Sequence, residues 1–350
     1  MFFFAAIASV AFASCTNDES VFDGAVNGNE INFAVAQYTP QTRAEHDPDV
    51  AFDGDITIWS WYDGKNTPVI PGDVYNQGAG KFTSNYIYYW PVDGSALDFV
   101  AVPSTLEGSA YFTEPGRAAD GATALTFVIP NGNDYHGKNI MTTEVETASS
   151  GTVALLFRHL LSKINIKVTQ KVRQTPGANP DARWLVTIKD IKVSGLKCAG
   201  EVVINDSWNA EDGNKLWDTT SGSETWQVTD GDAALYASID AGAAESAYTS
   251  AETYYLLPQI LEDGVQKITI DYTIETDYLG NPTQPNTVET YSKTFNLKGA
   301  TSIAQWSMNK VITYNISIDP SETLAPITFT VNEEEWGPES GSAPDVDPIP

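Results

Sequence analysis

Short runs of alternating apolar and polar residues recur along most of the chain, separated by Gly, Pro or Asp-Gly pairs. Alternation with a period of two is typical of β-strands that bury one face. The pattern predicts strands at Ile56–Tyr62, Tyr86–Trp90, Leu97–Val102, Ala124–Ile129, Ile140–Val145, Leu161–Thr169, Trp184–Val193, Glu201–Ile204, Tyr254–Leu257, Ile268–Ile274, Tyr291–Leu297 and Val311–Ile318. Because no long helical pattern separates these runs, we expect β-sandwiches and not βαβ units.

Two regions carry weaker signals. Val153–Leu161 is compatible with one turn of helix, and the polar stretch Trp208–Ser250 has no assignable pattern. Thr147–Gly151 is rich in small and polar residues and is the best candidate for a linker. At 350 residues the chain is long enough for two domains, so the sequence predicts an all-β protein divided near that linker.

Two further strands, at opposite ends of the chain, share one motif. Ile31–Tyr38 places Ile31, Phe33 and Val35 on one face, and Ile327–Val331 repeats this pattern with Ile327, Phe329 and Val331. Strands with the same one-sided pattern can occupy the same groove. Coincidence is the alternative, because alternating Ile, Phe and Val are common in β proteins.

The N-terminus resembles the leader of an exported lipoprotein. Met1–Ser14 contains no charged residue and is too short to cross a bilayer as a helix, which takes roughly 20 residues. Small residues stand directly before Cys15, as in a bacterial lipobox, so we expect Cys15 to be acylated after cleavage. A plain secretory signal with an incidental Cys15 is the alternative. A basic segment ahead of the apolar run is missing, so we expect the true start upstream of Met1.

The composition is strongly acidic, with a formal net charge of −27. Such a surface repels phosphates, which argues against nucleic acid as a partner. The motifs of nucleophile elbows, Walker loops and dinucleotide sites do not occur, so no cofactor is expected. The three histidines, His46, His136 and His159, have no zinc-ligand spacing, and Cys198 is expected to be a buried thiol.

Two clusters have both a functional and a structural interpretation. Asp47, Asp49, Asp53 and Asp55 miss the EF-hand spacing, so a solvated acidic loop is favoured over a calcium site. Aromatic residues could form a platform for sugars, but in strands such residues more often belong to the core. We favour the core for Trp59, Trp61, Tyr86, Tyr88, Tyr89 and Trp90.

Four blocks, in order, resemble those of fimbrillin-like (Mfa-like) proteins of Bacteroidetes. The blocks are Tyr88–Pro91 with Leu97–Pro103, Leu156–Ile164, Tyr255–Gln259 with Ile268–Tyr272, and Trp306–Lys310 with Tyr314–Ile316. Val311–Thr313 departs slightly from the family pattern.

The resemblance implies two tandem transthyretin-like β-sandwich domains and a role as a type V pilus subunit that supports adhesion, not an enzyme. It implies export to the outer membrane through a lipid on Cys15, followed by cleavage by an Arg-specific protease between Arg43 and Ala44. Arg43 is the only basic residue among the first 64 positions. The implied division is a signal peptide (1–15), a propeptide with the plug strand (16–43), and domains at 44–150 and 151–350.

Cleavage would release the plug strand and leave a groove for a strand of a neighbouring pilin subunit, with Ile327, Phe329 and Val331 as the candidate donor. Such a head-to-tail contact would build an extracellular fimbrium. A glycan-binding surface lipoprotein that keeps its anchor is the main alternative, and a glycosidase is a more distant one. Stalk or tip position, and any host or bacterial receptor, stay open.

Overall fold

A computed structural model describes residues 29–35, 54–62, 65–78, 81–106, 109–117, 123–129, 140–171, 174–175, 179–205, 217–221, 224–229, 232–235, 247–249, 254–278, 283–300, 303–320 and 327–335. Within these ranges the regular structure is almost entirely β-strand, which confirms the all-β class. The exceptions there are the 3₁₀ turn η1 (Ser104–Leu106) and the short helix α1 (Leu297–Ala300). Neither is long or apolar enough to cross a membrane.

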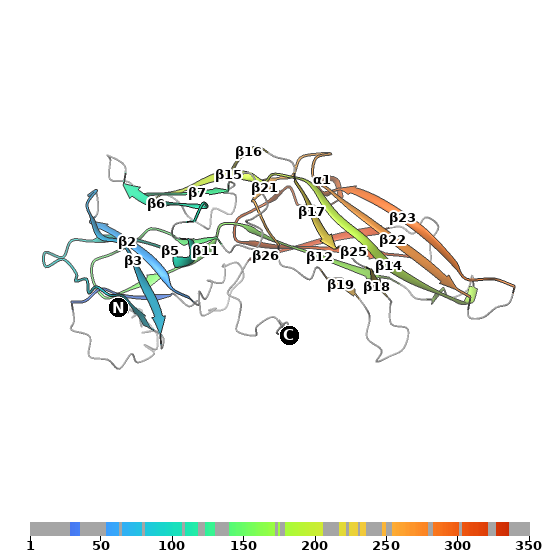
Figure 1. Cartoon of the computed structure of the whole chain (residues 1–350), viewed down its shortest axis with the longest axis horizontal. Coiled ribbons are helices and arrows are strands. Elements are labelled where there is room, and N and C mark those ends of the chain that lie inside the picture. Colours follow the sequence, from blue (N-terminus) through green and yellow to red (C-terminus); the bar gives the residue numbers. More distant parts are fainter. Residues whose placement is uncertain are drawn as a thin grey trace, which may run out of the picture.

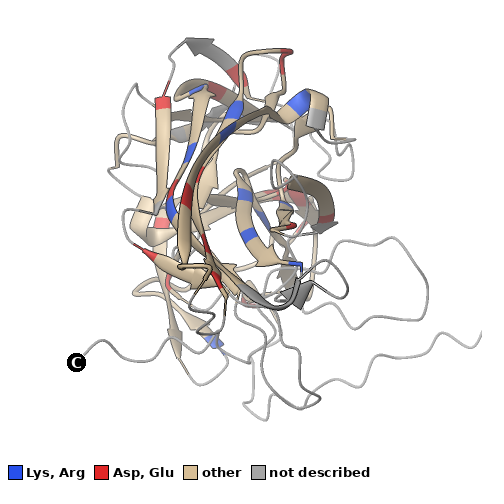
Figure 2. Cartoon of the chain, turned by 90° about the vertical axis from the view of Figure 1, so that its right-hand side faces the viewer, with Lys and Arg blue, Asp and Glu red and all other residues tan. Residues whose placement is uncertain are grey.

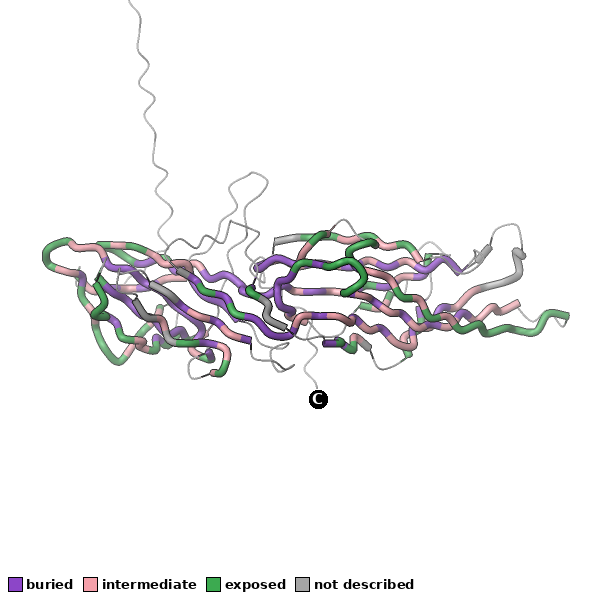
Figure 3. The backbone as a smooth tube through the Cα atoms, turned by 90° about the horizontal axis from the view of Figure 1, so that it is seen from above, coloured by how far each residue is buried: buried purple, intermediate pink, exposed green. Residues whose placement is uncertain are grey.

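The described strands form an elongated molecule (Figure 1). Those from the first third of the chain lie toward one end of the long axis, and those from the last third lie toward the other. Buried segments run through the interior of both halves, while exposed loops lie at the two ends (Figure 3). The arrangement as two transthyretin-like domains stays a prediction.

The N-terminal half contains a five-stranded sheet, a four-stranded sheet and two strand pairs. The five-stranded sheet has the order β4 (Lys81–Thr83), β3 (Pro68–Gly78), β2 (Ile56–Tyr62), β5 (Leu97–Pro103), β9 (Glu146–Ala148). The four-stranded sheet has the order β16 (Asp218–Ser221), β15 (Ala199–Asn205), β7 (Thr123–Ile129), β6 (Phe112–Arg117). The pairs are β1 (Asn32–Val35) with β10 (Thr152–Leu155), and β8 (Met141–Thr143) with β11 (Phe157–His159).

Strands β2 and β5 are buried on both faces. On one face, Trp59 and Val100 belong to a central core that also contains Phe127 of the four-stranded sheet. On the other face, Ile58 and Phe99 belong to a second core. We call this second core the groove core; its buried members are Ile31, Phe33, Ile56, Ile58, Ile70, Tyr75, Trp90, Leu97, Phe99, Ala101, Met141, Val153, Leu155 and Phe157.

The C-terminal half is built from two larger sheets and one small pair. One sheet has the order β19 (Ala247–Thr249), β12 (Ser162–Gln170), β25 (Lys310–Ile318), β26 (Ile327–Glu335), with β20 (Tyr254–Leu256) also on β12. The other has the order β13 (Gln174–Thr175), β14 (Asn179–Leu196), β22 (Lys267–Asp277), β23 (Thr287–Asn296), with β17 (Glu224–Thr229) and β18 (Ala233–Leu235) on β14. β21 (Gln259–Ile260) pairs with β24 (Gln305–Trp306).

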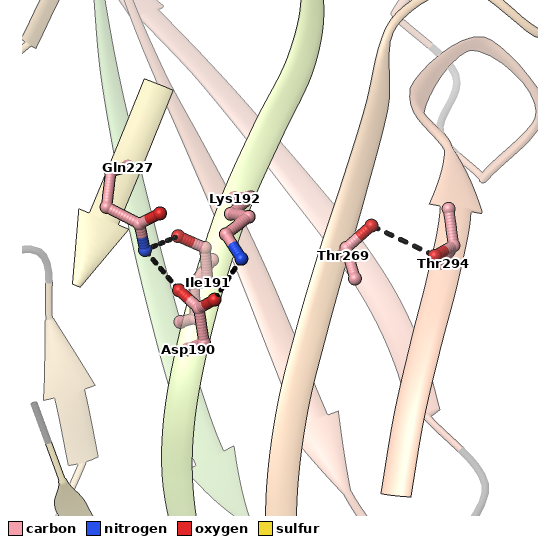
Figure 4. Close-up of polar contacts among 6 residues, drawn as sticks. All are labelled: Asp190, Ile191, Lys192, Gln227, Thr269 and Thr294. Atoms are coloured by element: carbon pink, nitrogen blue, oxygen red, sulfur yellow. Dashed lines mark hydrogen bonds and ion pairs between the residues drawn. The ribbon is translucent and has the colours of Figure 1, made fainter. Parts of the chain in front are cut away.

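The outer face of the β14–β22–β23 sheet is polar, while alternate residues such as Ile188 and Ile270 enter the C-terminal core. Figure 4 shows this outer face, where the Asp190 carboxylate accepts a hydrogen bond from the Gln227 side chain. The same carboxylate forms an ion pair with the Lys192 ammonium group, at 2.5 Å. The Thr269 and Thr294 hydroxyls lie 2.9 Å apart across β22 and β23. Basic and acidic residues occur along the same strands in this half of the molecule (Figure 2).

The consecutive strands β14 and β15 connect the two halves of the molecule. β14 pairs with β22 in the C-terminal half, and β15, two residues after it, pairs with β7 in the N-terminal half. Gly195 lies near the end of β14 with φ +76°, and a Cβ there would lie 2.2 Å from the Val265 carbonyl oxygen. Only glycine combines this backbone conformation with this close approach without strain.

Most strand predictions are confirmed, and β2 begins and ends at the predicted residues. The helical turn at Val153–Leu161 is wrong, because these residues form β10 and β11. The predicted linker Thr147–Gly151 overlaps β9 at Thr147 and Ala148 and ends just before β10. Strands on either side of residue 150 contribute to the same N-terminal cores. The division at residue 150 stays a prediction.

Candidate functional site

β1 lies between two other segments of the N-terminal half. Its residues pair in parallel with β10, from Asn32 opposite Thr152 to Val35 opposite Leu155. Just ahead of β1, Glu30 forms an isolated antiparallel bridge with Tyr89. β1 therefore connects β10 with Tyr88–Trp90, and we call the place it occupies the β1 groove.

Hydrogen bonds attach β1 to this second wall of the groove. The Ile31 N–H donates to the Tyr88 carbonyl oxygen at 2.8 Å, and the Trp90 N–H donates to the Asn29 carbonyl oxygen at 2.9 Å. The Trp90 indole N–H donates to the Gly151 carbonyl oxygen at 3.2 Å, which joins the two walls to each other. That last bond does not involve β1, so it can persist when β1 is absent.

The side chains of β1 complete the groove core. Ile31 and Phe33 are only 6% and 5% exposed, and Val35 packs partly buried beside them. The Phe33 ring lies 5.0 Å from the Tyr75 ring and 5.6 Å from the Phe99 ring, both edge to face. Burial of each such side chain stabilises by about 1.5–3 kcal/mol. Burial also raises the pKa of Tyr75 from 10 to about 12.

The structure shows the predicted one-sided packing of Ile31, Phe33 and Val35, and the strand begins at Asn32. Cys15, Arg43 and Ala44 lie outside the described residues, as do His46, His136 and the first three residues of the acidic cluster. Lipidation at Cys15 and cleavage after Arg43 stay predictions.

The candidate donor strand is paired within its own chain. β26 runs antiparallel to β25 along its whole length, from Ile327 opposite Ile318 to Glu335 opposite Lys310. Ile327, Phe329 and Val331 are partly buried against the C-terminal core, and the Phe329 ring lies 4.6 Å from the Phe295 ring. Among the described strands β26 has one neighbour, so it lies at the edge of its sheet.

The prediction that all six aromatic residues belong to the core is wrong for two of them. Trp59, Trp61 and Trp90 are buried, but Tyr86 and Tyr89 are 65% and 53% exposed. The predicted strand at Tyr86–Trp90 is also absent, because only Tyr89 forms a bridge. Tyr88 is half-buried and its hydroxyl donates to the Asp73 carboxylate, which anchors this segment to β3.

The remaining reactive side chains lie outside the groove core. His159 is buried, and burial together with nearby Lys163 holds the pKa of its imidazole well below the usual value. Cys198 is buried as predicted, and burial with the Glu224 charge raises the pKa of its thiol. In the part of the chain that the structure describes, no group of three His, Cys, Asp or Glu side chains is placed to hold a metal ion.

Glu224 predicts a pH dependence of stability. Burial raises the pKa of this carboxyl from 4.5 to about 7, so the folded chain binds its proton more tightly than the unfolded chain does. The free energy of unfolding therefore falls as the pH rises from about 4.5 towards 7. We expect Glu224→Gln to raise it by about 1–2 kcal/mol at pH 8 and by much less at pH 5, in urea titrations. Exposed Glu201→Gln is the control, and an equal gain at both pH values would contradict the assignment.

All four sequence blocks contribute to packing; in the third block, Leu256, Ile268 and Tyr272 are buried in the C-terminal core. The Trp90 and Phe99 rings lie 5.7 Å apart in the groove core. The backbone N–H of His159 donates to the Asn309 side-chain oxygen at 3.2 Å, and the Ser162 hydroxyl donates to the Ser307 carbonyl oxygen at 2.7 Å. These residues therefore connect separate sheets instead of forming a reactive centre.

The sequence profile described as fimbrillin-like matches residues 42–336. The chain belongs to the fimbrillin-like family. No curated protein sequence matches it. Among solved structures, a fimbrial protein from Bacteroides vulgatus is similar to this fimbrillin-like chain with 17% identity and a TM-score of 0.56, over 88% of this chain and 99% of that one.

The C-terminally truncated tip fimbrial protein Mfa3 from Porphyromonas gingivalis has 11% identity and a TM-score of 0.36, over 88% of this chain and 98% of that one. At such identities a structural likeness speaks only for the fold. Family membership itself rests on the profile match. The fimbrillin-like family consists of structural adhesion proteins and not of enzymes.

Proposed function

We propose that this fimbrillin-like chain is a subunit of a cell-surface fimbria, activated for polymerisation by removal of the segment that carries β1. The observation that carries the proposal is the β1 groove, where a short strand near the N-terminus supplies Ile31 and Phe33 to a core otherwise built from later residues. The family match supports the fimbrial role and the cell surface as its location. The same match supports a role for the fimbria in adhesion.

Cleavage between Arg43 and Ala44 would act by separating β1 from the rest of the chain. Before the cut, β1 is tethered and returns to the groove after each local opening. After the cut, its fragment is held only by non-covalent contacts, so the effective concentration set by the tether is lost. The released fragment would keep the lipid on Cys15 and leave the rest of the chain free to join a filament.

The empty groove would favour a replacement strand. Loss of β1 uncovers the Phe99 and Tyr75 rings and leaves the Tyr88 carbonyl and Trp90 N–H without their strand partners. Unpaired backbone groups beside an apolar groove are a template for β-augmentation. β26 of a neighbouring subunit supplies the same Ile-x-Phe-x-Val face, and its edge position means that detachment breaks the ladder with β25 alone among the described strands.

Cleavage-dependent polymerisation tests this function. We expect the wild-type chain to polymerise after digestion with an Arg-specific protease, and the Arg43→Ala chain to stay monomeric. Arg43→Lys is the matched control, because it resists an Arg-specific protease but is cut by trypsin and should then polymerise. Denaturing gels of the products and mass spectrometry of a new N-terminus at Ala44 measure the outcome. Normal polymerisation of Arg43→Ala would show that cleavage at this site is not the trigger.

The glycan-binding alternative has less support. Among the tryptophans within the described ranges, Trp184 is half-buried and the others are buried, so none presents an open ring face as a sugar platform. The exposed aromatic rings beside the groove are tyrosines, and their position next to β1 favours a role in assembly.

A further inference from the structure

An exposed apolar patch lies beside the β1 groove. Ile87, Tyr89 and Val92 are 64%, 53% and 101% exposed, and we call them the Tyr89 patch. Tyr88 and Trp90, which alternate with Ile87 and Tyr89, are half-buried and buried, so Ile87 and Tyr89 lie on the outer side of the groove wall, and Val92 lies in the turn that follows it. Large apolar side chains exposed together in one segment indicate an interaction surface.

Within residues 29–35, the part of the N-terminal segment that the structure describes, the residue opposite Tyr89 gives this patch no apolar cover. Glu30, the residue directly opposite Tyr89, is charged, and the residues before it in sequence are Asn27, Gly28 and Asn29. Directly opposed residues of an antiparallel pair lie on the same face, so the Glu30 side chain is the one nearest to the outer face of Tyr89.

The hydrogen bonds of the bridge define what a replacement strand must supply at this point. Asn29 provides its carbonyl oxygen to Trp90 and Ile31 provides its N–H to Tyr88, while neither backbone group of Glu30 bonds to this wall. A substitute therefore needs a carbonyl at the position of Asn29 and an N–H at the position of Ile31. At the position of Glu30 it needs neither, so proline is compatible there.

The segment before β26 meets these requirements. When Ile327, Phe329 and Val331 are placed on Ile31, Phe33 and Val35, Pro326 takes the position of Glu30 and Ala325 that of Asn29. Ile327 keeps the required N–H and Ala325 keeps the required carbonyl. Leu324 takes the position of Gly28, on the same face as Pro326.

We propose that the Tyr89 patch docks residues Leu324–Pro326 of a second copy of this chain, the segment that directly precedes its donor strand. This inference rests on the proposed function, because it presumes that β26 of one subunit replaces β1 of the next. Pro326 then packs on the Tyr89 ring, and Leu324 packs beside Val92. The patch is exposed in the free subunit because its apolar cover belongs to the neighbour.

This contact would favour replacement of β1 by the donor strand over the reverse exchange. β1 and the donor strand bury the same three types of side chain in the groove, so the groove alone distinguishes them little. Outside the groove, the N-terminal segment places the Glu30 carboxylate opposite Tyr89, whereas the donor would place proline and leucine there. Burying apolar surface on both partners favours the donor over the returning plug strand.

Peptide binding to the chain cleaved after Arg43 and freed of its N-terminal fragment tests the inference. Peptide 323–335 is compared with the same peptide carrying Leu324→Ser and Pro326→Ser, by fluorescence anisotropy. We expect the unmodified peptide to bind about tenfold more tightly, which corresponds to about 1.4 kcal/mol. In Tyr89→Ser protein this ratio should fall to the part that Leu324 contributes beside Val92, and the thermal transition should stay unchanged because Tyr89 is largely exposed.

The outcomes separate this inference from the proposed function. Equal, measurable binding of both peptides to wild-type protein overturns the docking of Leu324–Pro326 and leaves the donor strand intact. If neither peptide binds, both the docking of Leu324–Pro326 and the role of β26 as donor strand are overturned. Equal binding combined with slower polymerisation of Tyr89→Ser chains would mean that another part of the neighbouring copy covers the patch, which also overturns the assignment to Leu324–Pro326. Because the peptide substitutions leave the protein unchanged, the comparison holds even if Tyr89→Ser folds poorly.

Discussion

Phe33→Ala is expected to detach β1 from its groove in the uncleaved chain. Phe33 is 5% exposed and contacts the Tyr75 and Phe99 rings, so its truncation leaves a cavity in the groove core. Truncation of a buried phenylalanine costs about 3–5 kcal/mol. Since β1 lies near a chain end, this cost lowers the free energy of its local opening before that of global unfolding. Hydrogen exchange at the Ile31 amide, which donates to Tyr88, should be at least about 100-fold faster.

Asn32→Ala is the matched control for this experiment. Asn32 is the neighbouring residue of β1, is only half-buried, and its side-chain amide donates to the Glu30 carbonyl oxygen at 3.1 Å. We expect its substitution to accelerate exchange by less than about tenfold, because one part-exposed hydrogen bond contributes about 1 kcal/mol. Equal acceleration by the two substitutions would mean that Phe33 does not hold β1 in place.

Gly195→Ala should be among the most destabilising single substitutions in the C-terminal half. The new Cβ would lie 2.2 Å from the Val265 carbonyl oxygen and 2.8 Å from its carbonyl carbon, and both are backbone atoms. β14 and the turn that contains Val265 must move apart to accommodate it, and the positive φ adds strain for any L-residue. We expect the free energy of unfolding to fall by about 3–5 kcal/mol in urea titrations followed by tryptophan fluorescence.

Gly264→Ala distinguishes the cost of the positive φ from the cost of the close approach to Val265. Gly264 has φ +74°, almost that of Gly195, but nothing lies within 4 Å of its added Cβ. It should therefore show only the backbone cost of about 1–2 kcal/mol. If Gly195→Ala is no more destabilising than Gly264→Ala, the close approach to Val265 does not constrain the structure.

Strands could be predicted where the alternating pattern itself records one buried face. β22 is an example, since Ile268, Ile270, Tyr272 and Ile274 are buried and the residues between them are not. β2 was predicted from its apolar character, although it is buried on both faces. β10 was missed because its four residues alternate too briefly to be distinguished from a helical turn. Its pairing with β1, which is distant in sequence, leaves no local signal.

The candidate site could be predicted only in part for the same reason. The one-sided face of Ile31, Phe33 and Val35 is visible in the sequence, whereas the walls of the groove depend on pairing between distant segments. Tyr86–Trp90 has the composition of a strand, yet the pairing is limited to Tyr89 and leaves Tyr86 and Ile87 exposed. The prediction that Tyr86 and Tyr89 are buried in the core was wrong, because amino-acid composition does not show where the pairing between two strands ends.

The shared run formed by β14 and β15 has a mechanical consequence. Because β14 is bonded into a sheet at one end of the molecule and β15 into a sheet at the other, tension along the long axis passes through a nearly continuous backbone. A pull parallel to these strands loads their hydrogen bonds in shear, so many must break together instead of one after another. A chain built in this way would stretch little before it unfolds, a stiffness that would suit the proposed role as a fimbrial subunit under load.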